Sequence, residues 1–177
     1  QYRFSDNTTG GEAVLTLNES GFDRQFFNRD RANKYLTIAW NRGKKQSVTI
    51  DEVAVPMPAN SVVALTVNQS FRFEQPDDIV AWQFNRDFYC IIDHDREVSC
   101  AGLLFYGAWG PLVLQPAPDD VTRFAALLEE LVAAGEAVDR RTTEALGRLL
   151  NELPWGRELA RSHYVIERDG ALRRGSE

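Results

Sequence analysis

The stretch Ile79–Asn85, IVAWQFN, decides how this chain folds. Val80, Trp82 and Phe84 alternate with other residues, and a period of two is typical of a strand with one face in a hydrophobic core. The chain then brings together both of its cysteines and one of its two histidines: Cys90, His94 and Cys100. These features point in different directions, because a sheet core favours a binding module whereas clustered thiols and an imidazole favour a metal or redox site.

Short alternating runs extend the strand pattern toward the N-terminus. The segment Tyr35–Asn41, YLTIAWN, places Leu36, Ile38 and Trp40 on one face. Further strands are predicted at 46–50, 53–57, 61–67 and 69–74, with 79–85 completing the series. Turn residues separate these runs, as in RGKK at 42–45 and PDD at 76–78. Strands at a spacing of roughly 8–12 residues predict a sandwich or a barrel.

After Pro118 the period of the apolar residues changes from two to three and four. This pattern predicts a helix with Asp119 or Asp120 as N-cap and Gly135 as its stop, and a second helix from about residue 139 to Pro154. Two amphipathic helices with a short link form a helical hairpin. The chain is therefore expected to be mainly β with α: a β-barrel or sandwich in 1–115, a helical hairpin in 116–154, and a polar tail or linker in 155–177.

Composition restricts the partners of this chain. It has 177 residues and a formal net charge of −6. Such an acidic balance offers no basic face that could neutralise many phosphates, so we expect the chain alone to bind DNA poorly. No apolar run approaches the ~20 residues of a membrane span, and the start has no apolar signal-peptide region. We expect a cytoplasmic protein without a membrane partner.

The cysteine–histidine cluster is a weak metal motif. Structural zinc sites usually contain two cysteines with two to four residues between them. Here nine residues, His94 among them, lie between Cys90 and Cys100. Cysteine is also among the most frequently buried residues, so core thiols are the simpler interpretation. The chain has no G-x-S-x-G, H-E-x-x-H or glycine-rich phosphate loop. We therefore predict no metal, no cofactor and no catalytic residue.

Aromatic residues on the predicted strands are the candidate ligand contacts. Core packing is the simpler interpretation of these residues, but a barrel of this size can hold a small molecule between inward aromatics and a few amides. The predicted ligand-binding residues are Trp40, Asn68, Gln69, Phe71, Phe73, Trp82 and Phe84. A register shift of one residue would turn every one of the strand side chains to the opposite face.

Several segments together resemble one family. They are 28–30 (NRD), 33–41 (NKYLTIAWN), 68–69 (NQ), 85–90 (NRDFYC) and 102–105 (GLLF), with His94-Asp95, Glu97-Val98 and Cys100 between the last two. Over about Asp23–Gln115 the chain resembles the N-terminal sensor domain of AraC-type transcriptional regulators. The resemblance implies a cupin-like β-barrel that binds an effector, helices after the barrel that mediate dimerisation, and DNA recognition by a separate C-terminal helix-turn-helix domain.

The chain departs from that family in two respects. Pro154 and Gly156 interrupt its last segment, so no helix-turn-helix is predicted, and the His-x-His motif of catalytic cupins is absent. The resemblance therefore implies an effector-sensing and dimerisation domain whose partners are an unidentified small molecule, a second copy of the chain, and DNA only through a domain outside it. The predicted dimerisation residues are Val121, Phe124, Leu128, Leu131, Leu146, Leu149 and Leu153.

Two other functions compete with this interpretation. The first is a non-regulatory cupin enzyme or isomerase that uses Cys90, His94 and nearby carboxylates. The second is a protein-interaction module that acts through the helical hairpin. A helix-turn-helix encoded beyond Glu177 would favour the regulator over both.

Overall fold

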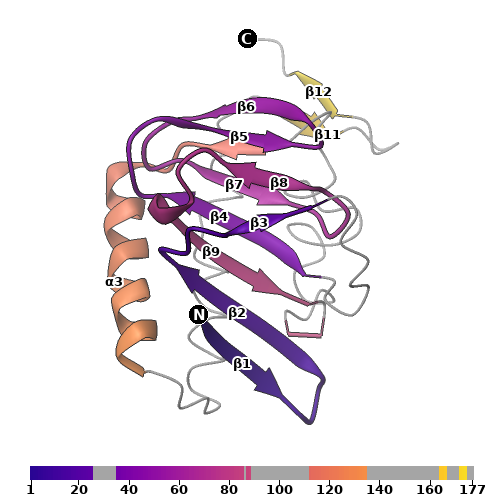
Figure 1. The fold of residues 1–177 in the computed structure, drawn as a ribbon, viewed down its shortest axis with the longest axis vertical. Coiled ribbons are helices and arrows are strands. Elements are labelled where there is room, and N and C mark those ends of the chain that lie inside the picture. Colours follow the sequence, from indigo (N-terminus) through magenta and orange to yellow (C-terminus); the bar gives the residue numbers. More distant parts are fainter. Residues whose placement is uncertain (26–34, 86, 89–111, 135–163, 167–171, 175–177) are drawn as a thin grey trace.

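The chain folds into two antiparallel sheets that pack face to face, with a helix lying across the direction of the strands (Figure 1). The computed structural model describes residues 1–25, 35–85, 87–88, 112–134, 164–166 and 172–174. Among these residues the architecture is mainly β, as the alternating pattern predicted. The two sheets are separate, so the arrangement is that of a sandwich.

The larger sheet has six strands. Their order is β1 (Tyr2–Asp6), β2 (Gly11–Leu17), β9 (Ile79–Phe84), β4 (Leu36–Asn41), β7 (Val62–Leu65) and β10 (Leu112–Leu114). All neighbours are antiparallel. In the centre, Trp82 of β9 lies opposite Ile38 of β4 and Leu15 of β2. Strand β4 is buried at all six positions, which is typical of a central strand covered on both faces.

The smaller sheet has four strands. Their order is β3 (Asp23–Arg24), β8 (Phe71–Phe73), β5 (Gln46–Ile50) and β6 (Val53–Met57), and the short 3-10 helix η1 (Pro76–Asp78) joins β8 to β9. Asp51 and Glu52 close the β5–β6 hairpin with positive φ angles of 46° and 69°. The Asp51 carboxylate accepts hydrogen bonds from Ser70 N at 2.8 Å and Ser70 Oγ at 3.0 Å, which ties this turn to the start of β8.

The two faces of the six-stranded sheet bury different sets of side chains. One face contacts the four-stranded sheet through an inter-sheet core that consists of Phe22, Ala39, Val48, Ile50, Met57, Val63, Leu65, Phe71, Phe73, Ile79 and Ala81. The other face contacts α3 (Pro118–Ala134) through a helix-side core that consists of Ala13, Leu15, Leu36, Ile38, Trp40, Val62, Ala64, Val80, Trp82, Phe84, Leu114, Phe124 and Leu128. The six-stranded sheet is therefore the middle layer of the molecule.

Most predicted elements before residue 135 are present. Helix α3 begins at Pro118, so Asp119 and Asp120 lie in its first turn and neither is the N-cap. Proline is favoured at the first helical position because the N–H that it lacks would be unpaired there in any case. Strands β1, β2, β3 and β10 were not predicted. The second predicted helix lies outside the described residues. Within the predicted tail, β11 (Tyr164–Ile166) pairs with β12 (Leu172–Arg174).

Candidate functional site

The predicted ligand-binding aromatics do not share one lumen. Trp40, Trp82 and Phe84 belong to the helix-side core, whereas Phe71 and Phe73 belong to the inter-sheet core. The prediction of a single inward set is therefore wrong. Its physical cause is that both faces of β4 and β9 are buried, so alternation alone does not reveal which face meets the second sheet.

The helix-side aromatics form a packed stack beneath α3. The rings of Trp40 and Trp82 lie 6.4 Å apart with an interplanar angle of 11°, and Phe124 of α3 lies 5.7 Å from Trp40. All three side chains are at most 3% exposed. This stack joins the helix to the two central strands of the middle layer.

The inter-sheet face of the same strands carries small and polar side chains. Ala39 lies opposite Ala81 at its centre, and these small residues leave room for the rings of the four-stranded sheet. The ring of Phe22, just before β3, packs against them, with its centre 5.2 Å from that of Phe71 and 5.9 Å from that of Phe73. Beyond the rings, toward the start of β4, the interior becomes polar.

Arg24 occupies this polar end of the interior and bridges the two sheets. It lies opposite Phe71 in the β3–β8 pair, and its guanidinium carbon is 5.0 Å from the centre of the Phe71 ring. Its Nη1 donates to Thr66 O at 2.6 Å and Gln69 O at 3.4 Å. Its Nη2 donates to Tyr35 O at 3.0 Å and Thr37 Oγ1 at 2.9 Å. One side chain thus connects β3 with β4 and with the turn after β7.

Thr37 and Gln83 complete the polar end of the interior. They lie opposite each other on β4 and β9, and Gln83 Nε2 donates to Thr37 Oγ1 at 3.2 Å. Thr37 is completely buried, while Gln83 is partly exposed. The Oε1 atom of Gln83 accepts no hydrogen bond from a described residue. We call Arg24, Thr37, Phe71 and Gln83 the Arg24 site.

The Arg24 site carries a positive charge that no described carboxylate neutralises. Burial lowers the pKa of Arg24 from its ordinary value, but a guanidinium remains charged at neutral pH. No carboxylate in the described part of the chain lies within 4.0 Å of its nitrogens. Its hydrogen-bond acceptors are the main-chain carbonyls of Tyr35, Thr66 and Gln69 and the hydroxyl of Thr37, and all four are neutral.

Two of the residues predicted from sequence adjoin the Arg24 site. Gln69 accepts from Arg24 through its main-chain oxygen, while its side chain closes the β7–β8 turn by accepting from Thr66 N at 2.8 Å. Phe71 lies against the guanidinium. Asn68 is exposed on the same turn. Sequence reasoning missed Arg24 and Thr37, because no local pattern distinguishes this arginine from the others in the chain.

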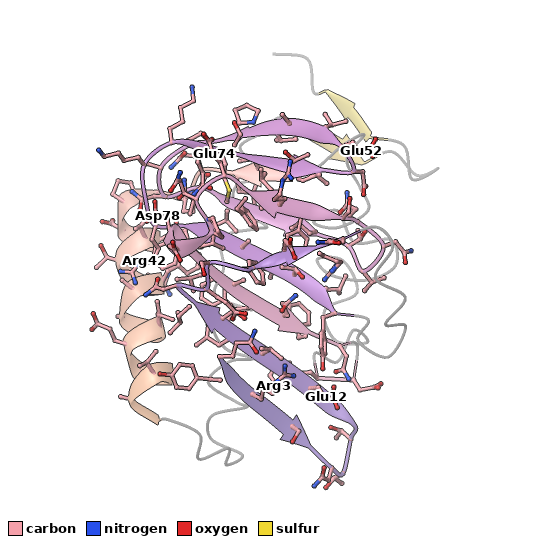
Figure 2. All side chains as sticks on the ribbon, in the orientation of Figure 1. Arg3, Glu12, Arg42, Glu52, Glu74 and Asp78 are labelled. Carbon is pink, nitrogen blue, oxygen red and sulfur yellow. The ribbon has the colours of Figure 1, made fainter. Side chains whose placement is uncertain are left out.

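A polar cleft of about 630 Å³ lies at the end of β4 and β9 that is opposite the Arg24 site. Its lining residues are Arg42, Gly43, Lys44, Lys45, Gln46, Glu74, Gln75 and Asp78. Figure 2 shows Arg42, Glu74 and Asp78 at the ends of the strands beside α3. Charges of both signs line this cleft, so it does not select one sign of ligand charge.

A buried amide pair holds the turn that forms this cleft. Asn41 Oδ1 accepts from Gln46 Nε2 at 2.9 Å and from Gly43 N at 3.1 Å. Asn41 Nδ2 donates to the main-chain oxygens of Lys44 at 2.8 Å and Pro58 at 3.0 Å. The chain itself thus satisfies these buried polar atoms, which makes the amide pair a structural element of the turn.

The predicted dimerisation residues on α3 face the interior of the protomer. Phe124 is 3% exposed and Leu128 is 4% exposed, and Val121 packs against the same helix-side core. Phe124 and Leu128 therefore stabilise the protomer, which corrects their assignment to a contact with a second copy. Of Leu131 only the main chain is described, and Leu146, Leu149 and Leu153 lie outside the described residues.

The remaining predictions concern metal and membrane. Cys90, His94 and Cys100 all fall outside the described residues. In the described part of the chain no three histidine, cysteine or acidic side chains gather in a way that could hold a metal ion. No described helix has the length and apolar character that crossing a membrane requires.

Comparison with solved structures places the fold among known proteins. An apo structure of ToxT from Vibrio cholerae matches with a TM-score of 0.52 at 14% identity, over 88% of this chain and 58% of that one. The AraC-like transcriptional activator CuxR matches with a TM-score of 0.45 at 8% identity, over 79% of this chain and 46% of that one. The chain thus spans little more than half the length of ToxT.

No protein-family model and no curated protein sequence matches the chain. At 14% identity the likeness to ToxT shows a shared fold, and this is consistent with the resemblance to AraC-type sensor domains.

Proposed function

We propose that the chain is the effector-sensing domain of a transcription regulator and that it binds a small molecule at the Arg24 site. The observation that carries the proposal is the partly buried guanidinium of Arg24, which lies between the two sheets without a described carboxylate partner. Ligand sites typically combine apolar walls with a few convergent polar groups. Here Phe71 supplies an apolar wall, and Thr37 and Gln83 supply polar groups.

The middle layer offers a physical route from the Arg24 site to α3. Thr37 and Gln83 face the site, while Trp40 and Trp82 on the same two strands face the helix. A ligand that changes the spacing of β4 and β9 therefore also moves the stack against which Phe124 packs. Packed cores switch between discrete arrangements, so a small shift at the site can become a shift of the helix.

The chemistry of the site favours binding over catalysis. General acid–base catalysis requires a group whose pKa lies near the working pH. Arginine, threonine and glutamine have no such group, and the site includes no described cysteine or histidine. We accordingly propose a sensor without enzymatic activity.

The proposed partners follow from the proposed role. A regulator of this kind acts in the cytoplasm as a homodimer and reaches DNA through a domain outside this chain. Phe124 and Leu128 are buried in the protomer, so a dimer contact would use other surfaces. Light scattering after gel filtration measures this directly, and a mass of twice 20.0 kDa is expected.

A thermal-melt screen against a metabolite library tests ligand binding. A compound at one hundred times its dissociation constant should stabilise the fold by roughly 2.7 kcal/mol. The Arg24→Gln variant should lose that stabilisation, whereas Arg42→Gln should retain it, because Arg42 is exposed at the far end of β4. Retention of the full effect in Arg24→Gln would place the ligand elsewhere, and a library without any stabilising compound would contradict the sensor role.

A further inference from the structure

The polar cleft at the ends of β4 and β9 has two walls of opposite charge. Its three cations, Arg42, Lys44 and Lys45, all belong to the turn between β4 and β5. Its two carboxylates, Glu74 and Asp78, belong to the segment that leads from β8 through η1 to β9. The cleft is therefore bipolar, with one basic wall and one acidic wall.

Contacts at the base of the cleft hold the two walls together. Arg42 N donates to Asp78 O at 2.9 Å, and Gln75 N donates to Oε1 of the buried Gln46 at 3.0 Å. Asp78 also packs directly on Gly43, where an added Cβ would overlap the carboxylate, so this approach requires glycine. The fold thus sets the spacing of the walls before any ligand binds, which lowers the ordering cost of binding.

The charges of the two walls do not neutralise one another. Among the described residues, no ion pair within 4.0 Å joins a cation of the cleft to a carboxylate of the cleft. Arg42 instead lies over the ring of Trp40, 5.1 Å from its centre, and no described residue accepts a hydrogen bond from the guanidinium. The Asp78 carboxylate likewise accepts no hydrogen bond from a described residue. Each wall therefore offers a charged group to a ligand.

We propose that the polar cleft is a second ligand site, distinct from the Arg24 site, and that it binds a zwitterion of the free amino acid or short peptide class. The ligand carboxylate pairs with Arg42 on the basic wall, and the ligand ammonium pairs with Asp78 on the acidic wall. The volume of about 630 Å³ falls in the range of roughly 300–1,000 Å³ typical of small-molecule sites. A simple anion or a simple cation would meet like charge on one of the two walls.

Arg42 connects this second site with α3. Its guanidinium covers the ring of Trp40, and the centre of that ring lies 5.7 Å from the ring centre of Phe124 on the helix. A ligand carboxylate competes for the same cation that attracts the ring. Occupancy of the cleft should therefore perturb the indole N–H signal of Trp40, although Trp40 does not line the cleft.

Amide NMR of the unmodified chain tests the site, with Gly43 as the reporter in the cleft and Gly11, at the far end of β2, as the control. The standard free amino acids and glycylglycine are titrated near pH 7. The tightest binder is then compared with its N-acetyl form, which lacks the ammonium, and with its amide, which lacks the carboxylate. We expect a saturable shift of Gly43 but not of Gly11, and at least about fivefold weaker binding of each blocked form.

Two variants assign the walls. Asp78→Asn should weaken the zwitterion at least about fivefold and leave its N-acetyl form unaffected, because that form has no ammonium to lose a partner. Arg42→Gln should weaken the zwitterion similarly and leave its amide unaffected. Glu52→Gln, on the opposite side of the molecule in Figure 2, and Arg24→Gln should both leave binding unchanged.

Equal binding of the zwitterion and both blocked forms would overturn the proposal, as would the absence of any saturable Gly43 shift. A zwitterion that requires Arg24 but not Arg42 would also overturn it, while supporting a sensor function at the Arg24 site. A zwitterion that requires Arg42 and Asp78 supports this inference even if no compound binds at the Arg24 site. Asp78→Asn preserves the shape of the side chain, so it decides the assignment if Arg42→Gln does not fold.

Discussion

Replacing Phe124 with alanine tests whether α3 is part of the protomer core. The Phe124 side chain is 3% exposed and packs on the ring of Trp40. Truncating a buried phenylalanine costs about 3–5 kcal/mol of folding free energy. Because α3 contacts the sheet through one face only, it can settle partly into the gap, so we expect the lower end, about 3 kcal/mol. For a chain of this size that loss lowers the melting temperature by roughly 6–12 °C.

Urea unfolding at two protein concentrations tenfold apart separates a core role from an interface role. If Phe124 is a core residue, the Phe124→Ala loss is the same at both concentrations. Glu129→Ala, on the exposed side of the same helix, should change the free energy of unfolding by less than about 0.5 kcal/mol. A loss below about 1 kcal/mol for Phe124→Ala, together with a halved particle mass in light scattering, would refute this reasoning and return Phe124 to a dimer contact.

Three further substitutions or conditions test the fold. Glu52→Gly should stabilise the protein by about 0.5–1 kcal/mol in urea unfolding, because glycine adopts the φ of 69° without strain; a clear loss would show that the glutamate side chain matters. Gly11→Ala should destabilise it by about 2 kcal/mol or more, since the new Cβ would lie 2.8 Å from Phe88 Cα; an unchanged midpoint would contradict that close approach. Burial and the hydrogen bond to Glu12 raise the pKa of Tyr35 from 10.0 to about 12. Between pH 10 and pH 12 the folded state therefore holds a proton that the unfolded state releases. The contribution of Tyr35 to the free energy of unfolding is fully present below pH 10 and is lost as the pH rises toward 12. Tyr35→Phe should make the free energy of unfolding depend less on pH in this range.

Alternation predicted the strands but not the direction of their faces. Every residue of β4, Leu36–Asn41, is buried. The sequence pattern predicts such a strand, but it does not tell whether Trp40 packs against a sheet or against a helix. Strand β2, which was not predicted, has four consecutive buried residues, from Ala13 to Thr16, so its burial does not follow a period of two. Burial on both faces is the common physical reason. Helix α3, which is covered on one side, was predicted from its pattern, although it begins at Pro118, before the predicted N-cap.

The Arg24 site could not be derived from sequence because its contacts are distant along the chain. The hydrogen-bond partners of Arg24 lie 11, 13, 42 and 45 residues away. Sequence patterns report spacing within one element, whereas this site joins two sheets. Gln69 and Phe71 were identified for their residue type on a predicted strand or turn, and the arginine that brings them together required the pairing of β3 with β8.

The paired indoles beneath α3 give the protein an optical signal of its own. Trp40 and Trp82 are nearly parallel at 6.4 Å, a separation at which their electronic transitions couple and produce a circular dichroism band sensitive to their mutual orientation. Neither indole N–H donates to an acceptor among the described residues, and both rings are buried, so their fluorescence should lie at short wavelength. Because Phe124 packs on one member of the pair, a movement of the helix would change this light signal without any attached label.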